Sequence, residues 1–409
     1  MKILYITPSG FDTFAGSNHL NMALVIDLLK IGHEIVFVQS NMHGPYNSIP
    51  DELKDKDKLE IISVDISEVN KRNKIKRVLS QNKFQRKVID KIKNIKNIDV
   101  AYVQSSGISI SLIKNLHKRN IPIIFNIQDL FPESIITTGM VKKGLIYNFF
   151  KKIQLKTFKY IDFFTVISAD IKTVLEKNYY IPTDKIEVVY NWYSETDIRE
   201  TLDKENKFVN KYNLNKGFKH VIQYAGNLGY VIDYNFLVQY AKKMENYKDY
   251  VIQIVGNGSN EKHLKDKVAN LNLTNIEFFD LQPNSIVSDV YSYSDLQIIP
   301  LKKGVIFHSV PSKVPIVMKC NRPVILISDS ESKYLKMLKE NNVAICLSHD
   351  QIDEAVDRTI TLFSNKENYK DLVNKASSFT KNNFSQKSQV SKIINLLCKM
   401  EKRKDIEHV

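Results

Sequence analysis

The chain has 409 residues, a length that suits two domains of roughly 150–200 residues better than one. A hydrophobic content of 43% and an aromatic content of 10% exclude wholesale disorder. The formal net charge is +14, and residues 71–96 hold eleven Lys/Arg against one acidic residue. Such charge attracts phosphorylated substrates, anionic lipid or nucleic acid. No nucleic-acid-binding module accompanies it, so we expect no nucleic-acid partner.

The sequence also lacks recognisable targeting signals and metal-binding motifs. No run approaches the roughly 18–20 apolar residues that span a bilayer, and the opening MKILYITPSG reads as a buried strand, unlike a signal peptide. The three cysteines, Cys320, Cys346 and Cys398, lack metal-ligand spacing. We therefore expect a cytoplasmic protein without a metal site.

The first half alternates short apolar strands with amphipathic helices. In chain order we predict strand Met1–Thr7, helix Asn18–Lys30, strand Ile35–Gln39, strand Val100–Gln104, helix Ile110–Lys118, strand Ile121–Asn126 and strand Phe163–Ile167. This rhythm is typical of a parallel sheet covered on both faces.

The rhythm restarts after a charged, apolar-poor stretch at about 195–217, which we interpret as a linker. The predicted strands that follow are His220–Ala225, Tyr250–Val255, Ile276–Phe279, Leu296–Ile299 and Pro323–Ile327, with a helical tail over Asn365–Met400. The sequence thus predicts an α/β protein of two doubly wound, Rossmann-like domains, 1–195 and 196–380, facing a central cleft. Residues 381–409 form a C-terminal helix that crosses back to the first domain. Ligands of such sheets gather at the carboxyl ends of the strands.

Two candidate sites lie in the first domain. The loop TPSGFDTFAGSNH carries Gly10 and Gly16 above the first strand, and it is either an anion-binding turn or a simple strand–helix connection. Asp129 and Glu133 follow the strand Ile121–Asn126 and are divided by a proline. They are candidate catalytic carboxylates, with helix N-capping by Asp129 as the alternative.

The second domain offers an anion site. Asn227 and Gly229 lie in the glycine turn YAGNLG directly after a strand, where backbone amides can hold a diphosphate. Lys303 lies on a Lys-Lys-Gly loop, and Ser312 with Lys313 opens a helix whose dipole favours anions. The alternative is a cluster of solvated lysines.

These segments, in this order, resemble glycosyltransferase family 4 of the GT-B fold. The closest likeness is to bacterial capsule and O-antigen enzymes of the N-acetylfucosamine transferase type. The resemblance covers nearly the whole chain, through GHEIVFV at 32–38, DLFPES at 129–134, TVISADIKTVL at 165–175, KIEVVYNWYS at 185–194, YAGNLG at 224–229, VGNGSN at 255–260, SDLQIIPL at 294–301, and PSK and RPVI near 311–325.

The resemblance implies a role for each candidate residue. Gly16 would lie beside the donor phosphates, Asp129 and Glu133 near the reacting sugar or acceptor, Asn227 and Gly229 by the diphosphate, and Gln282 near the base. Lys303 and Lys313, with Ser312, would bind the diphosphate leaving group, whose developing charge preorganised cations stabilise. The resemblance also implies that no metal or cofactor is needed besides the UDP-sugar donor.

The sequence departs from the family pattern at a pair of glutamates that many relatives carry before the RPVI-like segment. Their places here hold His308 and Ile316, and neither side chain can act as a carboxylate. We interpret this as a different mode of donor binding, in which Glu331 could substitute. His308 either hydrogen-bonds to the donor as a catalytic residue or is a polar loop residue.

Residues 141–164 join six lysines from 142 to 159 with a stripe formed by Leu145, Phe149, Ile153, Leu155 and Phe158. A basic amphipathic helix of this kind can lie on an anionic membrane. The alternative is a helix whose apolar side packs on the core. With the basic run at 71–96, we expect a membrane-peripheral protein at the inner face of the plasma membrane.

The function predicted from the resemblance is a retaining transfer of an N-acetylhexosamine, such as N-acetylfucosamine, from a UDP-sugar to a polyprenyl-linked saccharide. The product would enter capsule or O-antigen synthesis. Two alternatives stay open. One is a GT-B nucleotide-sugar 2-epimerase, which needs no acceptor, and the other is a non-catalytic partner subunit, motivated by His308 and Ile316.

Overall fold

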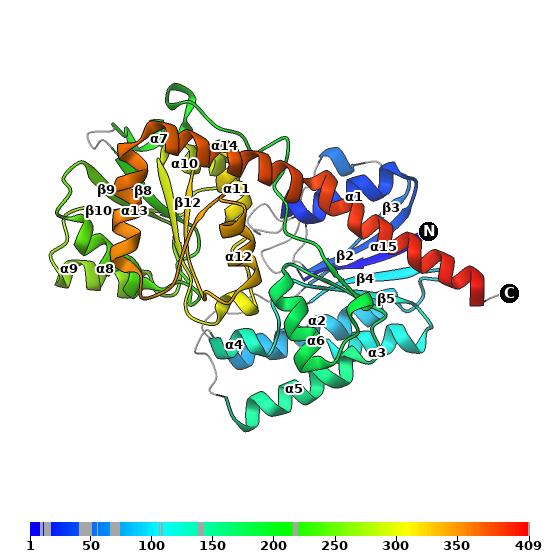
Figure 1. The fold of residues 1–409 in the computed structure, drawn as a ribbon. Helices are drawn as coiled ribbons and strands as arrows, with labels where there is room; N and C mark the ends of the chain where they lie inside the picture. The colour runs from blue at the N-terminus through cyan, green and yellow to red at the C-terminus, as the bar shows by residue number, and fades with distance from the viewer. Residues whose placement is uncertain are drawn as a thin grey trace. The chain divides into compact units, whose positions relative to one another are not determined.

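The structure is a computed structural model that describes residues 1–8, 11, 18–40, 51–54, 56–65, 74–105, 107, 109–137, 143–215 and 220–407. The chain folds into two compact units (Figure 1). The first comprises Met1–Ile136, Met140–Asn191 and Gln386–Val409, and the second comprises Thr137–Gly139 and Trp192–Ser385.

The first unit is built on a seven-stranded parallel sheet in the order β3-β2-β1-β4-β5-β6-β7. The strands are β1 (Lys2–Ile6), β2 (Glu34–Ser40), β3 (Leu59–Val64), β4 (Val100–Gln104), β5 (Ile123–Ile127), β6 (Phe163–Val166) and β7 (Ile186–Val188). The central strands are continuous apolar runs because helices cover both of their faces. The strand order reverses between β1 and β4, which makes their carboxyl ends the switch point of this sheet.

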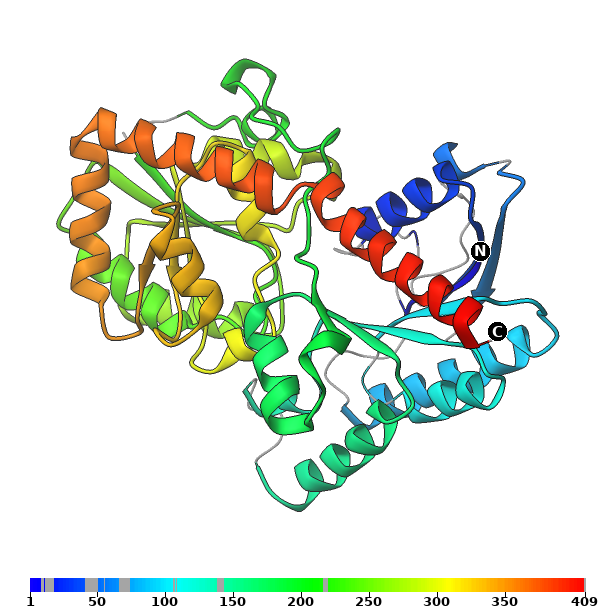
Figure 2. The same ribbon diagram turned by 45° about the vertical axis from the view of Figure 1, so that its right-hand side comes forward.

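Helices cover the first sheet on both faces (Figures 1 and 2). They are α1 (Asn18–Lys30), α2 (Lys74–Ile92), α3 (Ile110–Lys118), α4 (Glu133–Thr137), α5 (Leu145–Phe158), α6 (Ala169–Tyr179) and α15 (Gln386–Glu407). The helix α15 packs against α1, and α3 packs against both α2 and α5 on the other side. Although α15 ends the chain, the Gln389 side chain accepts a 2.8 Å hydrogen bond from the Tyr190 amide, which ties α15 to this unit.

The second unit contains a six-stranded parallel sheet in the order β10-β9-β8-β11-β12-β13. The strands are β8 (His220–Ala225), β9 (Tyr250–Val255), β10 (Ile276–Phe279), β11 (Leu296–Pro300), β12 (Val324–Ile327) and β13 (Ile345–Leu347). The helices are α7 (Lys207–Tyr212), α8 (Tyr234–Met244), α9 (Glu261–Asn270), α10 (Val287–Tyr293), α11 (Lys313–Lys319), α12 (Lys333–Glu340), α13 (Ile352–Ser364) and α14 (Lys366–Asn383). The order reverses between β8 and β11.

A ladder of buried amides fixes the register of this sheet. Gln297, Gln223 and Gln253 are register partners on β11, β8 and β9. The Gln297 side chain donates to Gln223 at 2.7 Å, and Gln223 donates to Gln253 at 3.3 Å. Since a buried amide without a partner is costly, a shift of one residue in any strand would break the ladder.

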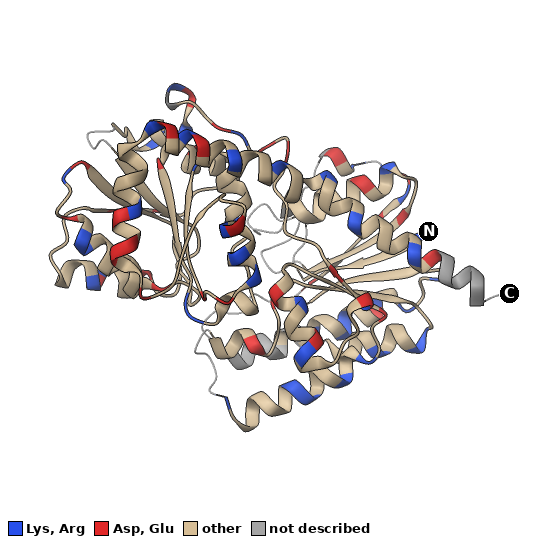
Figure 3. Ribbon diagram, in the orientation of Figure 1, with Lys and Arg blue, Asp and Glu red and all other residues tan. Residues whose placement is uncertain are grey.

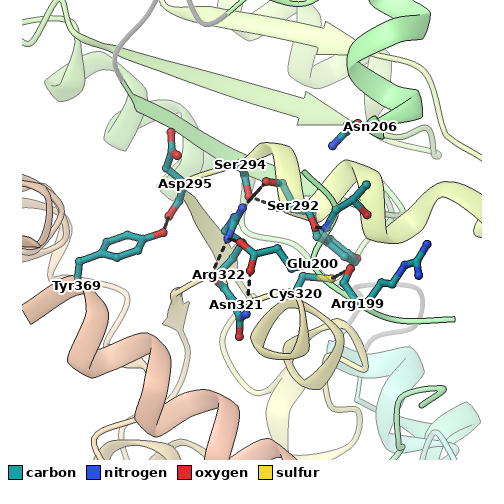
Figure 4. A network of polar contacts seen from close by, with 12 residues as sticks. Arg199, Glu200, Asn206, Ser292, Ser294, Asp295, Cys320, Asn321, Arg322 and Tyr369 are labelled. Carbon is teal, nitrogen blue, oxygen red and sulfur yellow. Dashed lines mark hydrogen bonds and ion pairs between the residues drawn. The ribbon is translucent and has the colours of Figure 1, made fainter. Parts of the chain in front are cut away.

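The charged stretch after the first unit is anchored to the second (Figure 4). The Arg322 guanidinium donates to the Ser292 carbonyl at 3.1 and 2.7 Å and pairs with Glu200 at 2.6 Å. Asn321 donates to the other Glu200 oxygen at 2.9 Å. The part of the predicted linker around Glu200 is therefore held against α10 and the turn before β12.

The strands that the sequence analysis named all form, within one or two residues of their predicted ends, and the α/β architecture is as predicted. Three strands were not predicted, namely β3, β7 and β13. All three are sheet edges, and β7 and β13 have three residues each. The predicted helical tail is two helices, because Phe384 and Ser385 interrupt it. Of the helices in the described ranges, none has the length and apolar character required to cross a bilayer.

Candidate functional site

The switch point of the second sheet brings together two segments that are far apart in the sequence. The chain leaves β8 toward β9 and leaves β11 toward β12, so the loops after β8 and β11 diverge from neighbouring strands. Lys313, the first residue of α11, follows β11, yet its Nζ donates a 2.7 Å hydrogen bond to the carbonyl of Ala225 at the end of β8. The topology thus delivers a cation to the edge where open α/β sheets bind ligands.

The Lys313 ammonium group is held by two uncharged partners, the Ala225 carbonyl and the Tyr224 ring. Its Nζ lies 3.9 Å from the centroid of the Tyr224 ring, a close cation–π contact. Burial lowers the pKa of Lys313 to about 7, and no carboxylate in the described part of the chain offsets this effect. An anion bound here would favour the protonated form and raise the pKa again.

The loop after β8 lies against Lys313 in a backbone conformation that favours glycine. Gly226 has a φ of 141°, and a Cβ built on it would lie 2.5 Å from the Lys313 Nζ. Gly256, in the loop after β9, has a φ of 145°, and its Cβ would collide with the carbonyl of Gly226. The two loops are joined by hydrogen bonds from the Gly226 amide to Val255 at 2.8 Å and from the Leu228 amide to Asn257 at 2.8 Å.

Two tyrosines fix the carbonyls of the same loop. The Tyr224 hydroxyl donates to the carbonyl of Asn227 at 2.8 Å, and the Tyr234 hydroxyl donates to the carbonyl of Gly229 at 2.7 Å. The Asn227 side chain is exposed beside Gly229. With its carbonyls held in this way, the loop is a rigid backbone platform beneath a lysine, a geometry suited to phosphate oxygens.

The other predicted donor residues occupy neighbouring loops of the same unit. Lys303 and Ser312 are exposed, and Ser312 precedes α11 without capping it through its side chain. Because α11 has only seven residues, its dipole is small, and the Lys313 side chain carries the charge of the site. Gln282 lies beyond β10, where it donates to the Tyr212 hydroxyl at 2.8 Å and accepts from Lys211 at 2.9 Å.

His308 is a neutral side chain at physiological pH. It follows the 3-10 turn Val305–Phe307, and burial lowers its pKa to about 4. Its Nδ1 is buried and has no hydrogen-bond partner among the described residues. A neutral imidazole can donate or accept one hydrogen bond but adds no positive charge. Of the other residues in question, Ile316 is half-buried on α11 and Glu331 is exposed.

The two candidate carboxylates of the first unit have different surroundings. Asp129 is exposed on the loop after β5, whereas Glu133 is buried at the start of α4. The Glu133 carboxylate accepts from the Tyr179 hydroxyl at 2.8 Å on both oxygens and from the Tyr147 hydroxyl at 3.2 Å. Burial raises the pKa of Glu133, while these hydrogen bonds and the nearby Lys151 oppose the rise. Its oxygens are therefore engaged within the protein. The predicted Gly16 lies outside the described residues.

The sequence analysis missed a group of hydrogen-bonded polar side chains at Gln128, the residue before Asp129. The Gln128 side chain donates to Asn126 at 3.3 Å and accepts from Asn191 at 3.0 Å. Asn191 follows β7, so its nearness to β5 depends on strand order, which no local pattern encodes. The position of Tyr224 beneath Lys313 was missed for the same reason.

The helix α5 differs from the predicted amphipathic pattern. Phe158 is buried, and the side facing the core is formed by Tyr147, Gln154, Thr157 and Phe158. Leu145 and Phe149 instead point outward, with 89% and 60% of their surface exposed. Helical spacing of four, seven and eleven residues places them in one outward stripe with Lys152 and Lys156, which are also exposed. The outward face of α5 is therefore apolar in its first turns and basic beyond them. Figure 3 shows the positions of the lysines along this helix.

Two family models match the chain one after the other. Residues 16–195 match the model described as Glycosyltransferase Family 4, and residues 204–379 match the model described as Glycosyl transferases group 1. Each match corresponds to one of the predicted doubly wound domains. Together they leave only short segments unmatched.

A curated relative is the probable glycosyltransferase WbjE of Pseudomonas aeruginosa, 20% identical over 218 residues. The match spans 53% of this chain and 54% of the relative, so about half the length of each is related at this level.

Solved structures match over the whole length. Sucrose-phosphate synthase from Thermosynechococcus elongatus is 12% identical with a TM-score of 0.78, covering 98% of this chain and 99% of its own. Anabaena Alr3699/HepE, solved in complex with UDP, is 11% identical with a TM-score of 0.70, covering 98% and 100%. At such identities the likeness shows the fold, which is the GT-B fold predicted from the sequence.

The Gly226 geometry leads to a first prediction. Gly226→Ala places a methyl group against the Lys313 Nζ and should weaken binding of UDP, used as a diphosphate probe, by roughly thirtyfold, about 2 kcal/mol. Gly32→Ala is the matched control, because Gly32 also has a positive φ, 93°, but a Cβ built on it would meet no atom within 4 Å. Isothermal titration calorimetry measures both. Equal affinity of the two variants would refute the close approach.

The pKa of Lys313 leads to a second prediction. Below pH 7 the lysine is already protonated in the free protein, so UDP binding needs no proton. Above pH 7 Lys313 is mostly deprotonated in the free protein, so UDP binding takes up one proton from solution. The affinity for UDP should therefore fall by up to roughly tenfold per pH unit until the raised pKa of Lys313 in the bound state is reached. The phosphate itself, with a second pKa near 6, does not titrate in this range.

Calorimetry from pH 7 to 9 in buffers of different ionisation enthalpy would detect this proton uptake. Lys313→Ala should bind UDP weakly and show no such dependence between pH 7 and 9. A flat profile for the unaltered protein would contradict the assignment.

Proposed function

We propose that this chain, which belongs to the GT-B glycosyltransferases, transfers a sugar from a UDP-sugar donor to a lipid-linked saccharide acceptor. In this proposal the second unit binds the donor, and the first unit binds the acceptor. The observation that carries it is the Lys313 ammonium, held over Tyr224 at the glycine loop of β8. The likeness to HepE, which was solved with UDP, supports UDP as the nucleotide.

Lys313 acts on the leaving group. As the bond between the anomeric carbon and the β-phosphate oxygen breaks, negative charge develops on the diphosphate. A protonated Lys313 stabilises that charge. The backbone amides of Asn227 and Gly229 supply hydrogen bonds from the loop, since those of Gly226 and Leu228 are bonded to Val255 and Asn257. Its contact with the Ala225 carbonyl is exchanged for one with phosphate when donor binds. Lys303, Ser312 and Gln282 extend the donor site around this centre.

The acceptor hydroxyl oxygen forms the new bond to the anomeric carbon. In the retaining course that we propose, attack and departure share one face, and the hydroxyl proton passes to the leaving diphosphate oxygen. Asp129, exposed at the carboxyl end of β5, orients the acceptor hydroxyl, and neutral His308 hydrogen-bonds to donor sugar or phosphate. Cationic side chains carry the role that a metal ion would otherwise have.

The sequence motifs resemble those of N-acetylfucosamine-type transferases. This resemblance supports an N-acetylhexosamine such as N-acetylfucosamine as the transferred sugar, and capsule or O-antigen synthesis as the setting. The enzyme would work at the inner face of the plasma membrane, where polyprenyl-linked saccharides are extended.

The direct test is donor binding and turnover. UDP should bind in calorimetry, and Lys313→Ala should lower its affinity by roughly thirtyfold, the loss of a charge-assisted hydrogen bond of about 2 kcal/mol. Lys319→Ala, at the other end of α11, should leave affinity unchanged. Failure of the unaltered protein to bind UDP would indicate the non-catalytic partner subunit. Isomerised UDP-N-acetylhexosamine formed without an acceptor would indicate the 2-epimerase.

The outward face of α5 supports the membrane part of the proposal. Leu145, Ile146 and Phe149 expose 89%, 59% and 60% of their surface, which is unusual for side chains of this size. Exposed lysines adjoin them, namely Lys143, Lys152, Lys156 and Lys159. Apolar side chains that enter the acyl boundary, beside lysines that meet phosphates, fit an anionic lipid surface. The helix α2, also basic, lies on the same side of the sheet (Figure 2).

Charge reversal tests the membrane face. Changing Lys143, Lys152, Lys156 and Lys159 to Glu should abolish flotation with phosphatidylglycerol vesicles, because each lysine near an anionic surface contributes about 1 kcal/mol. The matched control changes Lys242, Lys248, Lys262 and Lys336, exposed lysines of the second unit, to Glu. Lys151 is left intact because it lies over the rings of Tyr147 and Tyr179. If both variants float equally, α5 is not the membrane face.

A further inference from the structure

The loop that carries Asp129 is attached to the first two turns of α5 by two side-chain contacts. The rings of Phe131 and Phe150 meet edge to face, with centroids 5.3 Å apart. Two residues after Phe131, the Glu133 carboxylate accepts a 3.2 Å hydrogen bond from the Tyr147 hydroxyl. Both contacts join the acceptor-side loop to α5 through side chains.

Glu133 is the centre of a small buried cluster. Besides Tyr147 of α5, it accepts from Tyr179 of α6 at 2.8 Å on both oxygens. The Lys151 Nζ lies 5.9 Å from the Tyr147 ring centroid and 5.5 Å from that of Tyr179. One carboxylate therefore connects α4, α5 and α6. Since its oxygens are engaged in this way, we assign Glu133 a positioning role, in which its influence on the reaction passes through the loop.

The same two turns of α5 have a second, opposite face. Tyr147, Phe150 and Lys151 point toward the cluster, whereas Leu145 and Phe149 lie on the outward stripe with Lys152. Residues two apart on a helix project roughly 200° apart, so both faces belong to the same two turns. A contact that keeps these turns helical at one face therefore also holds the side chains of the other face. A surface that holds Leu145 and Phe149 also restrains Tyr147 and Phe150.

We propose that α5 couples membrane contact to the Asp129 loop, with Glu133 as the positioning residue that receives it through Tyr147. This inference rests on the proposed membrane face and deepens it. Away from the membrane, the exposed first turns of α5 fray, and the loop loses two of its attachments. On an anionic surface these turns are ordered, and Asp129 is held in place for an acceptor that is itself anchored in the membrane.

The test is hydrogen exchange of the full chain with and without phosphatidylglycerol vesicles, followed by mass spectrometry. Vesicles should slow exchange in residues 129–137 by about tenfold, because local opening of the loop is suppressed. Tyr147→Phe keeps the ring but removes the hydroxyl that reaches Glu133, so it should float normally yet lose most of this protection. Tyr180→Phe, at an exposed neighbouring tyrosine, should behave like the unaltered protein.

A second variant separates coupling from simple structural support. Glu133→Gln in the otherwise unaltered protein keeps an oxygen that accepts from the tyrosines and should retain most of the vesicle-dependent protection. If the cluster were only structural, Tyr147→Phe would speed exchange equally with and without vesicles, and the protection caused by vesicles would persist. That result would overturn the inference, as would vesicle binding without protection of 129–137. Neither result would affect the donor site, whereas failure to float would also remove the membrane part of the proposed function.

Discussion

A lysine ammonium held at the end of β8 by one carbonyl and one aromatic ring is the interaction on which the proposed donor site depends. Neither contact supplies a negative charge, and burial alone lowers the pKa of Lys313 to about 7. A cation left in this state gains from any anion that reaches it. The cost of burying the ammonium is relieved locally, because the ammonium can leave the Ala225 carbonyl for a phosphate oxygen without rearranging the sheet. In the proposed reaction, donor binding and leaving-group stabilisation are one electrostatic effect.

The glycine loops make that effect possible. A Cβ on Gly226 would displace the Lys313 Nζ from its present position, and a Cβ on Gly256 would collide with the Gly226 carbonyl. The strand order then places this pair beside α11 at the switch point. In the first unit the buried Glu133 accepts hydrogen bonds from Tyr147 and Tyr179, whereas Asp129 is exposed. We therefore assign the proposed acceptor contact to Asp129.

Much of the fold could be predicted from the sequence because strands buried on both faces are continuous apolar runs, as in Val100–Gln104 and Tyr250–Val255. The strands that were not predicted, β3, β7 and β13, lie at the edges of their sheets. An edge strand has a neighbouring strand on one side only, so its apolar pattern is weaker. The glycine turn and Lys313 could be identified as separate features. Their contact, the Tyr224 ring, the Asn191–Gln128 hydrogen bond and the burial of Glu133 could not, because each depends on which strands are neighbours. The predicted apolar stripe of α5 placed Phe158 on the same side as Leu145 and Phe149, but Phe158 is buried and the other two are exposed. Helical spacing alone does not indicate which of these side chains pack on the core.

The most direct measurement is a crystal structure of the protein with UDP bound. The Lys313 Nζ should lie within hydrogen-bond distance of a β-phosphate oxygen, no longer bonded to the Ala225 carbonyl, with the amides of Asn227 and Gly229 facing the diphosphate. A diphosphate bound elsewhere, with Lys313 still on the Ala225 carbonyl, would contradict the assignment of the donor site.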